Sequence, residues 1–291
     1  MKNNKFAAFI LSHGRANCVY TYQSLRDCGY TGNIYIIVDD EDEQLAEYKK
    51  KYKKQVIVFN KAKAWENVDY ADTVDNKKTA LPARNICFKL AKKLGLTHFV
   101  ELDDDYTTFR YRFEDNGVLK SCRIKKLDRV FDILCNFLND TSANAICFAQ
   151  GGDFVGGIGS AVWKRKLARK AMNAFVCKTD RPFDFLGRIN EDVTAYTRLT
   201  QQGYLFFTLA DITIQPMPTQ TLEGGVSDVY ASQGTYTKSF YSVMFSPSCV
   251  KIASMGGASA GHCYRRIHHF VEWDKCAPCI ISDKYRKARE E

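Results

Sequence analysis

Residues 33–60 read NIYIIVDDEDEQLAEYKKKYKKQVIVFN, two apolar runs separated by a charged stretch. The runs at 33–42 and 55–60 are short and rich in isoleucine and valine, which is typical of buried strands. Between them, LAEYKKKY has the composition of a surface helix. Upstream, KFAAFILS indicates another buried strand, followed by a helix at 20–28. Strands and helices that alternate at this spacing predict a parallel α/β unit.

The same alternation continues along the chain. Pro82 suits the first turn of a helix and Gly95 its end, and the strand THFVELDDD follows. A glycine-rich stretch, GGDFVGGIGSAVW, comes after a later apolar run, and from about Gln215 the chain is expected to be irregular. The sequence therefore predicts one α/β domain of Rossmann type, with a mixed, mainly parallel sheet flanked by helices and an irregular C-terminal segment. Other expected elements are helices at 127–140 and after 190, and strands at 144–150 and 204–210.

Composition indicates a soluble, intracellular and cytoplasmic protein. No stretch approaches the roughly 20 apolar residues that span a bilayer, and the N-terminus lacks a secretory pattern. Most of the eleven cysteines stand singly in apolar runs, as reduced thiols do. The net charge of +9 favours a polyanionic partner, although solvated helix faces explain such charge equally well. Lysine and arginine cluster at 49–54, 163–170 and 283–289.

Polar loops follow three of the expected strands, at 12–15, 39–42 and 103–105. In parallel sheets ligands bind at the carboxyl ends of strands, so these loops are expected to converge. Asp103 and Asp105 alternate and offer hard oxygen ligands, which predicts a site for Mg²⁺ or Mn²⁺ with Asp104 turned away. The alternative for 103–105 is a solvated turn.

These motifs, in this order, resemble a nucleotide-sugar glycosyltransferase of the GT-A fold, whose aspartate-x-aspartate motif is LDDD here. More narrowly, ILSHGRA, IYIIVDDED, ARN and ELDDDYTTFR resemble the TET-associated glycosyltransferases, mostly encoded by phages, and more distantly the base J glucosyltransferase. The resemblance covers most of the first 210 residues. It implies a single GT-A-like domain with a nucleotide-binding half at 1–110, an acceptor half at 111–214 and a C-terminal lid or extension at 215–291.

The resemblance also implies which residues bind the UDP-sugar donor. The 12–15 loop, Asp39 and Asp40 would hold nucleobase and ribose, and Arg84 and Asn85 would lie near ribose and sugar. Alternatives remain: the 39–42 acids can cap the next helix, Arg84 can pair with an acid, and the glycines can form a plain turn. The full expected donor set is Ser12, His13, Gly14, Arg15, Asp39, Asp40, Arg84, Asn85, Asp103, Asp104, Gly156 and Gly157.

Asn190, Glu191 and Asp192 open a predicted helix, where acids are stabilised and Asn190 can be the cap. By resemblance, Asp192 is the general base that deprotonates the acceptor, with Glu191 as second choice. His262 would join Asp103 and Asp105 on the metal, although a surface or core histidine is the ordinary alternative. A zinc knuckle that includes Cys276 and Cys279 is the weakest of these hypotheses.

The expected function is metal-dependent transfer of glucose or N-acetylglucosamine from a UDP-sugar to a hydroxymethylated pyrimidine in DNA. The favoured acceptor base is 5-hydroxymethylcytosine, and the favoured outcome at the anomeric carbon is inversion. Such an enzyme would work in the cytoplasm of a phage-infected bacterium and would flip the target base. Alternatives are a protein or glycan acceptor, a nucleotidyltransferase, and a non-catalytic nucleic-acid-binding protein. The groups expected to touch DNA are the 164–170 cluster with Trp163, and Arg265 and Arg266 beside Tyr264.

Overall fold

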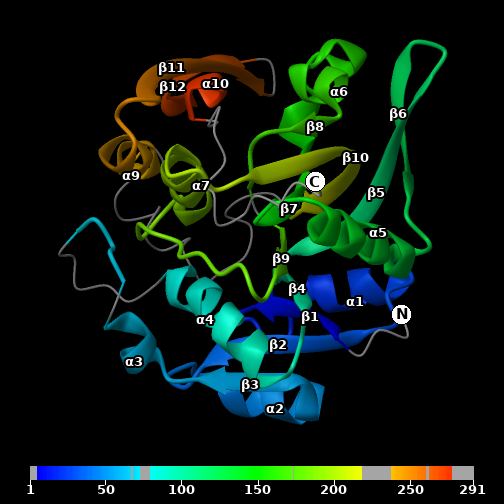
Figure 1. Cartoon of the computed structure of the whole chain (residues 1–291), viewed down its shortest axis with the longest axis vertical. Coiled ribbons are helices and arrows are strands. Elements are labelled where there is room, and N and C mark those ends of the chain that lie inside the picture. The colour runs from blue at the N-terminus through cyan, green and yellow to red at the C-terminus, as the bar shows by residue number, and fades with distance from the viewer. Residues whose placement is uncertain are drawn as a thin grey trace, which may run out of the picture.

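A computed structural model describes residues 5–66, 68–72, 79–172, 174–217, 237–259 and 262–276 (Figure 1). Cys279 and the 283–289 basic cluster lie outside these residues, as do the side chains of His262, Tyr264 and Arg266. Helices cover both faces of a large sheet. Its strands are β1 (Phe6–Leu11), β2 (Asn33–Asp39), β3 (Val56–Phe59), β4 (His98–Asp103), β5 (Tyr106–Asp115), β6 (Val118–Arg123), β7 (Ala145–Ala149), β8 (Leu167–Ala168), β9 (Phe175–Lys178) and β10 (Phe206–Pro216).

Within the described residues the sheet order is β3-β2-β1-β4-β9-β7-β10-β5-β6, with β8 paired to β10. β3, β2, β1 and β4 are mutually parallel. β9 is antiparallel to both β4 and β7, so β7 and its parallel neighbour β10 point the same way as β4. The mixed, mainly parallel sheet is thereby confirmed. It also places the ends of β1, β2, β4, β7 and β10 along one edge.

Each face of the sheet has its own core, as the alternation along β1 illustrates. Phe6, Ala8 and Ile10 pack into one core. Ala7 and Phe9 pack into the other, and every residue of β1 is buried. Strands buried on both faces read as continuous apolar runs, which is why they were recognisable in the sequence. The helices are α1 (Tyr20–Asp27), α2 (Leu45–Tyr52), α3 (Lys61–Trp65), α4 (Leu81–Lys93), α5 (Leu127–Asp140), α6 (Ala161–Arg165) and α7 (Glu191–Gln201), with 3-10 turns η1 (Lys53–Gln55), η2 (Gly151–Phe154) and η3 (Gly157–Gly159).

The described part of the C-terminal segment is more regular than expected. It contains α9 (Thr237–Phe245), a separate two-stranded hairpin of β11 (Val250–Ser259) and β12 (His262–Val271), and α10 (Trp273–Cys276). This unit packs on α7 through α9 and α10 (Figure 1). No helix among the described residues is both long and apolar enough to cross a bilayer.

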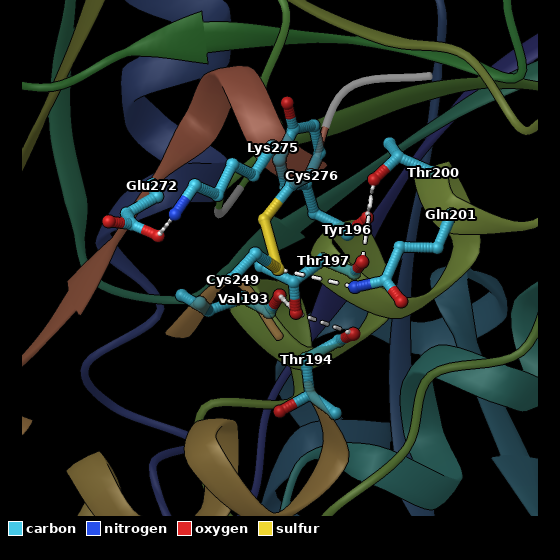
Figure 2. Close-up of a disulfide and its surroundings, with 10 residues drawn as sticks. All are labelled: Val193, Thr194, Tyr196, Thr197, Thr200, Gln201, Cys249, Glu272, Lys275 and Cys276. Carbon is cyan, nitrogen blue, oxygen red and sulfur yellow. Dashed lines mark hydrogen bonds and ion pairs between the residues drawn. A yellow bond between two sulfur atoms is a disulfide. The ribbon is translucent and has the colours of Figure 1, made fainter. Parts of the chain in front are cut away.

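A disulfide joins Cys249, just before β11, to Cys276 in α10. Both cysteines are buried, and the side-chain amide of Gln201 donates to the Cys249 sulfur (3.2 Å; Figure 2). The zinc hypothesis is therefore wrong for Cys276, because its sulfur is bonded to another sulfur. The expectation of reduced thiols fits the free cysteines, which in the described residues are Cys18, Cys28, Cys87, Cys122, Cys135, Cys147 and Cys177.

We expect Cys249→Ser to lower the free energy of unfolding by about 3 kcal/mol, because the bond closes a loop with a sequence separation of 27 residues. Guanidinium unfolding with and without reductant measures this. Reductant should shift the wild-type curve toward that of Cys249→Ser and leave the variant unchanged. Cys122→Ser, which removes an exposed free thiol, is the matched control. A wild-type unfolding curve that does not shift when reductant is added would contradict the expectation.

Candidate functional site at the carboxyl edge of the sheet

The loops after β1 and β4 are held together by Asp104. Its carboxylate accepts hydrogen bonds from the Ser12 hydroxyl (2.6 Å) and from Arg15 Nη1 (3.0 Å). The Ser12 oxygen also lies 2.6 Å from the Tyr48 hydroxyl of α2. Ser12 and Asp104 are both buried. Asp104 thus faces the β1 loop, and its contacts fix that loop on the end of the neighbouring strand.

His13 and the end of β2 form a second cluster. His13 Nδ1 donates to Asp39 Oδ2 (2.7 Å) and lies 3.4 Å from Asp42 Oδ2. The hydrogen bond to Asp39 is the main reason that the pKa of His13 is raised, against partial burial. Burial opposes ionisation of Asp39, but His13 and the Lys61 ammonium, 3.3 Å from Asp39 Oδ1, outweigh it and lower the pKa of Asp39.

Among the described residues, His13, Asp39 and Asp42 are also a group that could hold a metal ion, with one ligand atom from each within 4.8 Å of the others. The Gly14 amide already donates to Asp42 Oδ2 (2.8 Å), and Lys61 lies against Asp39. Much of the negative charge is therefore already offset. Asp42 Oδ1 accepts from the Gln44 amide (2.8 Å) in the turn before α2, and because α2 has no side-chain cap, the capping alternative is wrong for this helix.

Asp40 has a different environment from Asp39. Its side chain is exposed and accepts from Asn60 Nδ2 (2.6 Å) and from the Lys61 amide (2.8 Å), at the start of α3. These bonds attach the end of β2 to the chain after β3. The expected contact of Asp40 with the nucleoside competes with this task.

Arg84 on α4 lies at the centre of an acidic network. Its Nε donates to Glu191 Oε1 (2.9 Å) and its Nη2 to Asp103 Oδ1 (2.8 Å). Only 4% of the Arg84 side chain is exposed, so it is a buried bridge between β4 and α7. This favours the ion-pair alternative over direct contact with a phosphate, because two of its three nitrogens are occupied.

Glu101 is the functional candidate that sequence reasoning missed. It is fully buried in β4, and its Oε2 lies 4.0 Å from Arg84 Nη1. Burial, opposed by Arg84, raises the pKa of Glu101 to about 8. The spacing of Glu101 from Asp103 could have identified it from the sequence. In a strand, residues two apart share a face, so Glu101 points to the same side as Asp103.

Asn85, also on α4, is engaged by Phe185. Its Oδ1 accepts from the Phe185 amide (2.7 Å), and its Nδ2 donates to the Phe185 carbonyl (3.1 Å). Both ends of the side-chain amide thus pair with backbone 100 residues away in sequence. Asn85 thus pins the segment that leads to α7, and its expected place near ribose and sugar stays a prediction.

Asp105 lies where β4 and β10 end together, since its carbonyl accepts from the Met217 amide (3.0 Å). Burial, followed by the charges of Asp103 and Asp104, raises the pKa of Asp105 to about 7. Asp103 Oδ2 accepts from the Tyr106 hydroxyl (3.1 Å). The backbone of His262 belongs to β12, whereas its side chain lies outside the described part of the structure.

The turn before α7 is anchored by Asn190. Asn190 has a left-handed φ of +60° and does not cap the helix with its side chain, so the capping expectation was wrong. Its Nδ2 donates to Ser242 Oγ in α9 (3.1 Å) and to His269 Nδ1 in β12 (3.1 Å). Asp192 is buried, and its Oδ1 accepts from the Val193 amide (2.7 Å). The hairpin therefore braces the turn that carries both candidate catalytic acids.

Acid is expected to weaken this brace. An amide nitrogen only donates, so His269 Nδ1 must be unprotonated to accept from Asn190. Burial, then His268 and Lys238, lower the pKa of His269 to about 4. Its neutral form therefore contributes stability above its unfolded pKa of about 6.5, and that contribution is lost as pH falls from there toward 4.

His269→Asn keeps an acceptor near Nδ1 but does not titrate. The free energy of unfolding of this variant should fall less between pH 7 and pH 5 than that of wild type. Buried His98, with a pKa also lowered to about 4, leaves a residual pH dependence in both proteins. Equal losses in the two proteins would show that His269 plays no part.

The glycine-rich segment lies at the end of β7, on the same edge of the sheet. Gly156 and Gly157 have φ values of +92° and +60°, which favour glycine.

The expectation that Trp163 and Lys170 touch DNA is wrong. Trp163 is only 5% exposed and packs with Phe154 and Ala210, and Lys170 is buried against Asp153, so neither presents a surface to a partner.

A family model described as TET-Associated Glycosyltransferase matches residues 6–225 of the chain. No curated protein matches the chain. Three solved structures are distantly similar. S. aureus TarS 1–349 in complex with UDP is 10% identical, over 82% of this chain and 64% of that one, with a TM-score of 0.44. Mannosyltransferase PcManGT from Pyrobaculum calidifontis, in complex with GDP-Man and Mn²⁺, is 11% identical, over 83% and 61%, with a TM-score of 0.45. GalNAc-T7 with UDP, GalNAc and Mn²⁺ is 13% identical, over 74% and 44%, with a TM-score of 0.43. This chain spans less than two thirds of the length of each.

Proposed function

The chain belongs to the TET-associated glycosyltransferase family, and from this premise we propose that it transfers a sugar from a UDP-sugar to a hydroxymethylated pyrimidine in DNA. Glucose or N-acetylglucosamine is the proposed sugar, and 5-hydroxymethylcytosine is the preferred base. One observation supports a transfer site above all: Arg84 joins Asp103, at a strand end, to Glu191, in the 190–192 turn. The proposed donor side and the proposed acceptor side are thus one side chain apart.

For the donor, the His13 and Asp39 pair is the proposed contact with nucleobase and ribose, since a carboxylate accepts from ribose hydroxyls. The φ of Gly14 is +66°, and nothing lies within 4 Å of where its Cβ would be, so a ligand can approach this backbone closely. Arg15, held by Asp104, is the proposed cation for the diphosphate. Ser12 and Asp104 act by positioning that loop.

For the metal, we propose Asp103 and Asp105 rather than the His13 group. Three adjacent carboxylates lie near Arg15 and Arg84, and burial, followed by repulsion from Asp103 and Asp104, raises the pKa of Asp105 to about 7. A position where negative charge is this unfavourable fits a divalent cation with hard oxygen ligands. Bound there, Mn²⁺ or Mg²⁺ would be a Lewis acid for the leaving diphosphate. His262 as a third ligand rests on the family resemblance.

For the acceptor, Asp192 is the proposed general base and the lean toward inversion depends on it. Glu191 is tied to Arg84, which opposes the effect of burial on the pKa of Glu191. A carboxylate held in an ion pair is a weaker base, because the pair stabilises its ionised form. Glu191 is therefore proposed to orient the turn, and Asp192 to remove the proton from the incoming hydroxyl.

The test has two stages. UDP-sugars are first screened for thermal stabilisation of the protein with and without Mn²⁺, because a ligand of the folded state raises apparent stability. The stabilising sugar, labelled, is then offered to duplexes that contain 5-hydroxymethylcytosine, 5-hydroxymethyluracil or cytosine. We expect labelling of 5-hydroxymethylcytosine DNA and release of UDP. Equal labelling of all three duplexes, or labelling of protein or glycan alone, would defeat the DNA acceptor. Release of pyrophosphate would indicate a nucleotidyltransferase.

A further inference from the structure

One face of the β5–β6 ribbon is crowded with arginine. Arg110 and Arg123 are directly opposite each other in the ladder, so their side chains share a face, and Arg112 follows two residues after Arg110. Like charges in opposed positions repel, and that arrangement costs stability unless an anion offsets it. Three acids lie close by: Asp27 pairs with Arg123, Glu114 is exposed on the same face, and Asp211 of the neighbouring strand β10 pairs with Lys166 (3.5 Å).

The guanidinium groups are held in place. Arg110 donates to the Ser121 hydroxyl (2.9 Å) and carbonyl (2.9 Å). Arg112 donates to Thr213 Oγ1 (2.8 Å), and its guanidinium carbon lies 4.0 Å from the centre of the Phe154 ring. Both side chains are half-buried, so their stems pack while part of each head stays accessible.

The segment that contains α6 and β8 extends this charged surface. Leu119 of β6, Phe154 of η2 and Trp163 of α6 share one apolar cluster, which fixes α6 on the arginine-bearing face of the ribbon. In Figure 1, α6 and the ribbon stand at the same end of the molecule. The exposed basic residues of this segment are Lys164, Arg165, Lys166 and Arg169. We call these four, with Arg110, Arg112 and Arg123, the basic face.

The strand that carries Arg110 and Arg112 starts at the candidate site. β5 starts at Tyr106, directly after Asp105, and Arg110 follows five residues later, a distance of about 17 Å along the strand. On the other side, η2 follows the end of β7 at the same edge of the sheet. The phosphates of one DNA strand advance about 3.4 Å along the duplex axis per nucleotide, so about 17 Å along that axis corresponds to about five nucleotides.

We propose that the basic face binds the phosphate backbone of duplex DNA on one flank of the target base, about five nucleotides from it. This inference rests on the proposed DNA acceptor and adds where the duplex lies. Counterion release from the phosphates would drive binding, and the bases on this flank would not be read. The fixed guanidinium groups suit phosphate oxygens, which arginine binds through paired donors.

The first experiment is salt-dependent binding of an unmodified duplex, measured by fluorescence anisotropy. The variant Lys164→Glu/Arg165→Glu reverses two charges on α6, and Arg112→Glu tests the ribbon separately. The double variant should bind about tenfold or more weakly at low salt, and its slope of log K against log salt should flatten by about 1.8, the value for two lost phosphate contacts. Lys49→Glu/Lys50→Glu is the matched control, since it makes the same charge change on exposed positions of α2, beside the opposite end of the sheet.

The second experiment locates the flank. Duplexes carry the target base 2, 5 or 10 base pairs from either end, and circular dichroism confirms that each variant is folded. Wild type should lose affinity when one flank, and not the other, is shortened below about five base pairs. The double variant should be insensitive to that shortening. Equal sensitivity of wild type and the double variant would overturn the proposal.

The outcomes separate this inference from the proposed function. If wild type labels DNA but the double variant and the α2 control bind DNA equally well, the basic face is wrong and the DNA acceptor stands. If wild type labels no DNA yet binds it through the basic face, the proposed acceptor chemistry fails and the surface stands. If wild type neither labels nor binds DNA, both are overturned.

Discussion

Asp105→Ala should reduce sugar transfer by about 10³-fold or more, because the metal ion proposed to act as Lewis acid for the leaving diphosphate would lose a ligand. Donor binding should lose its dependence on Mn²⁺ as well. The fold should survive, since the substitution removes a carboxyl whose pKa is already raised to about 7 by burial and by Asp103 and Asp104. Initial rates of transfer, and calorimetric titration of UDP with and without Mn²⁺, measure these effects.

The control for Asp105→Ala is Asp132→Ala, which removes an exposed acid from α5 and should leave both readouts unchanged. Asp42→Asn tests the rival cluster with His13 and Asp39. If Asp42→Asn abolishes the metal dependence while Asp105→Ala retains it, the ion belongs to the rival cluster. Full activity of Asp105→Ala would remove Asp105 from the site.

Asp192→Asn should lower transfer by about 10²-fold or more while donor affinity persists. Asparagine keeps the shape and an oxygen that can accept from the Val193 amide, but it cannot take a proton at neutral pH. The loss should therefore appear in kcat, and the dissociation constant for the UDP-sugar should stay within about twofold. Pre-steady-state transfer to a 5-hydroxymethylcytosine duplex separates the chemical step from product release.

Two further variants serve as controls for the interpretation of Asp192→Asn. Asp180→Asn makes the same chemical change at an exposed turn and should be silent. Glu191→Gln weakens the bond with Arg84, so it should alter metal and donor binding as well as rate. A wild-type rate for Asp192→Asn would make Asp192 a structural residue of the first turn of α7.

The sequence predicted the elements whose signals are local. β1, β2 and β4 are buried on both faces, and the apolar runs of β1 and β2 showed this directly, whereas Glu101 interrupts the run of β4. The placement of acids after β2 and β4 and of a polar loop after β1 then followed from parallel topology, and the structure brings these ends together. Only the side-chain partners were left undetermined, because spacing along a chain does not specify which side chains face each other.

Elements that depend on distant partners were not predicted. β9 is four residues long and inserts antiparallel between β4 and β7, a position that its own sequence does not indicate. β11 of the β11–β12 hairpin contains glycine and serine, the hairpin packs on α9, and a disulfide joins the segments on either side of it. Its stability comes from tertiary contacts, so local propensity gave no signal.

By itself, therefore, the sequence determined the α/β sheet, the edge of that sheet where polar loops gather, and the family to which the chain belongs. Only the tertiary structure decided that Arg84 bridges Asp103 and Glu191, that Asn85 holds Phe185, and that Trp163 is buried. The physical reason is that a residue's role follows from which groups compete for its donors, acceptors and apolar surface. Those competitors come from segments up to about a hundred residues away in sequence, and folding alone brings them into contact.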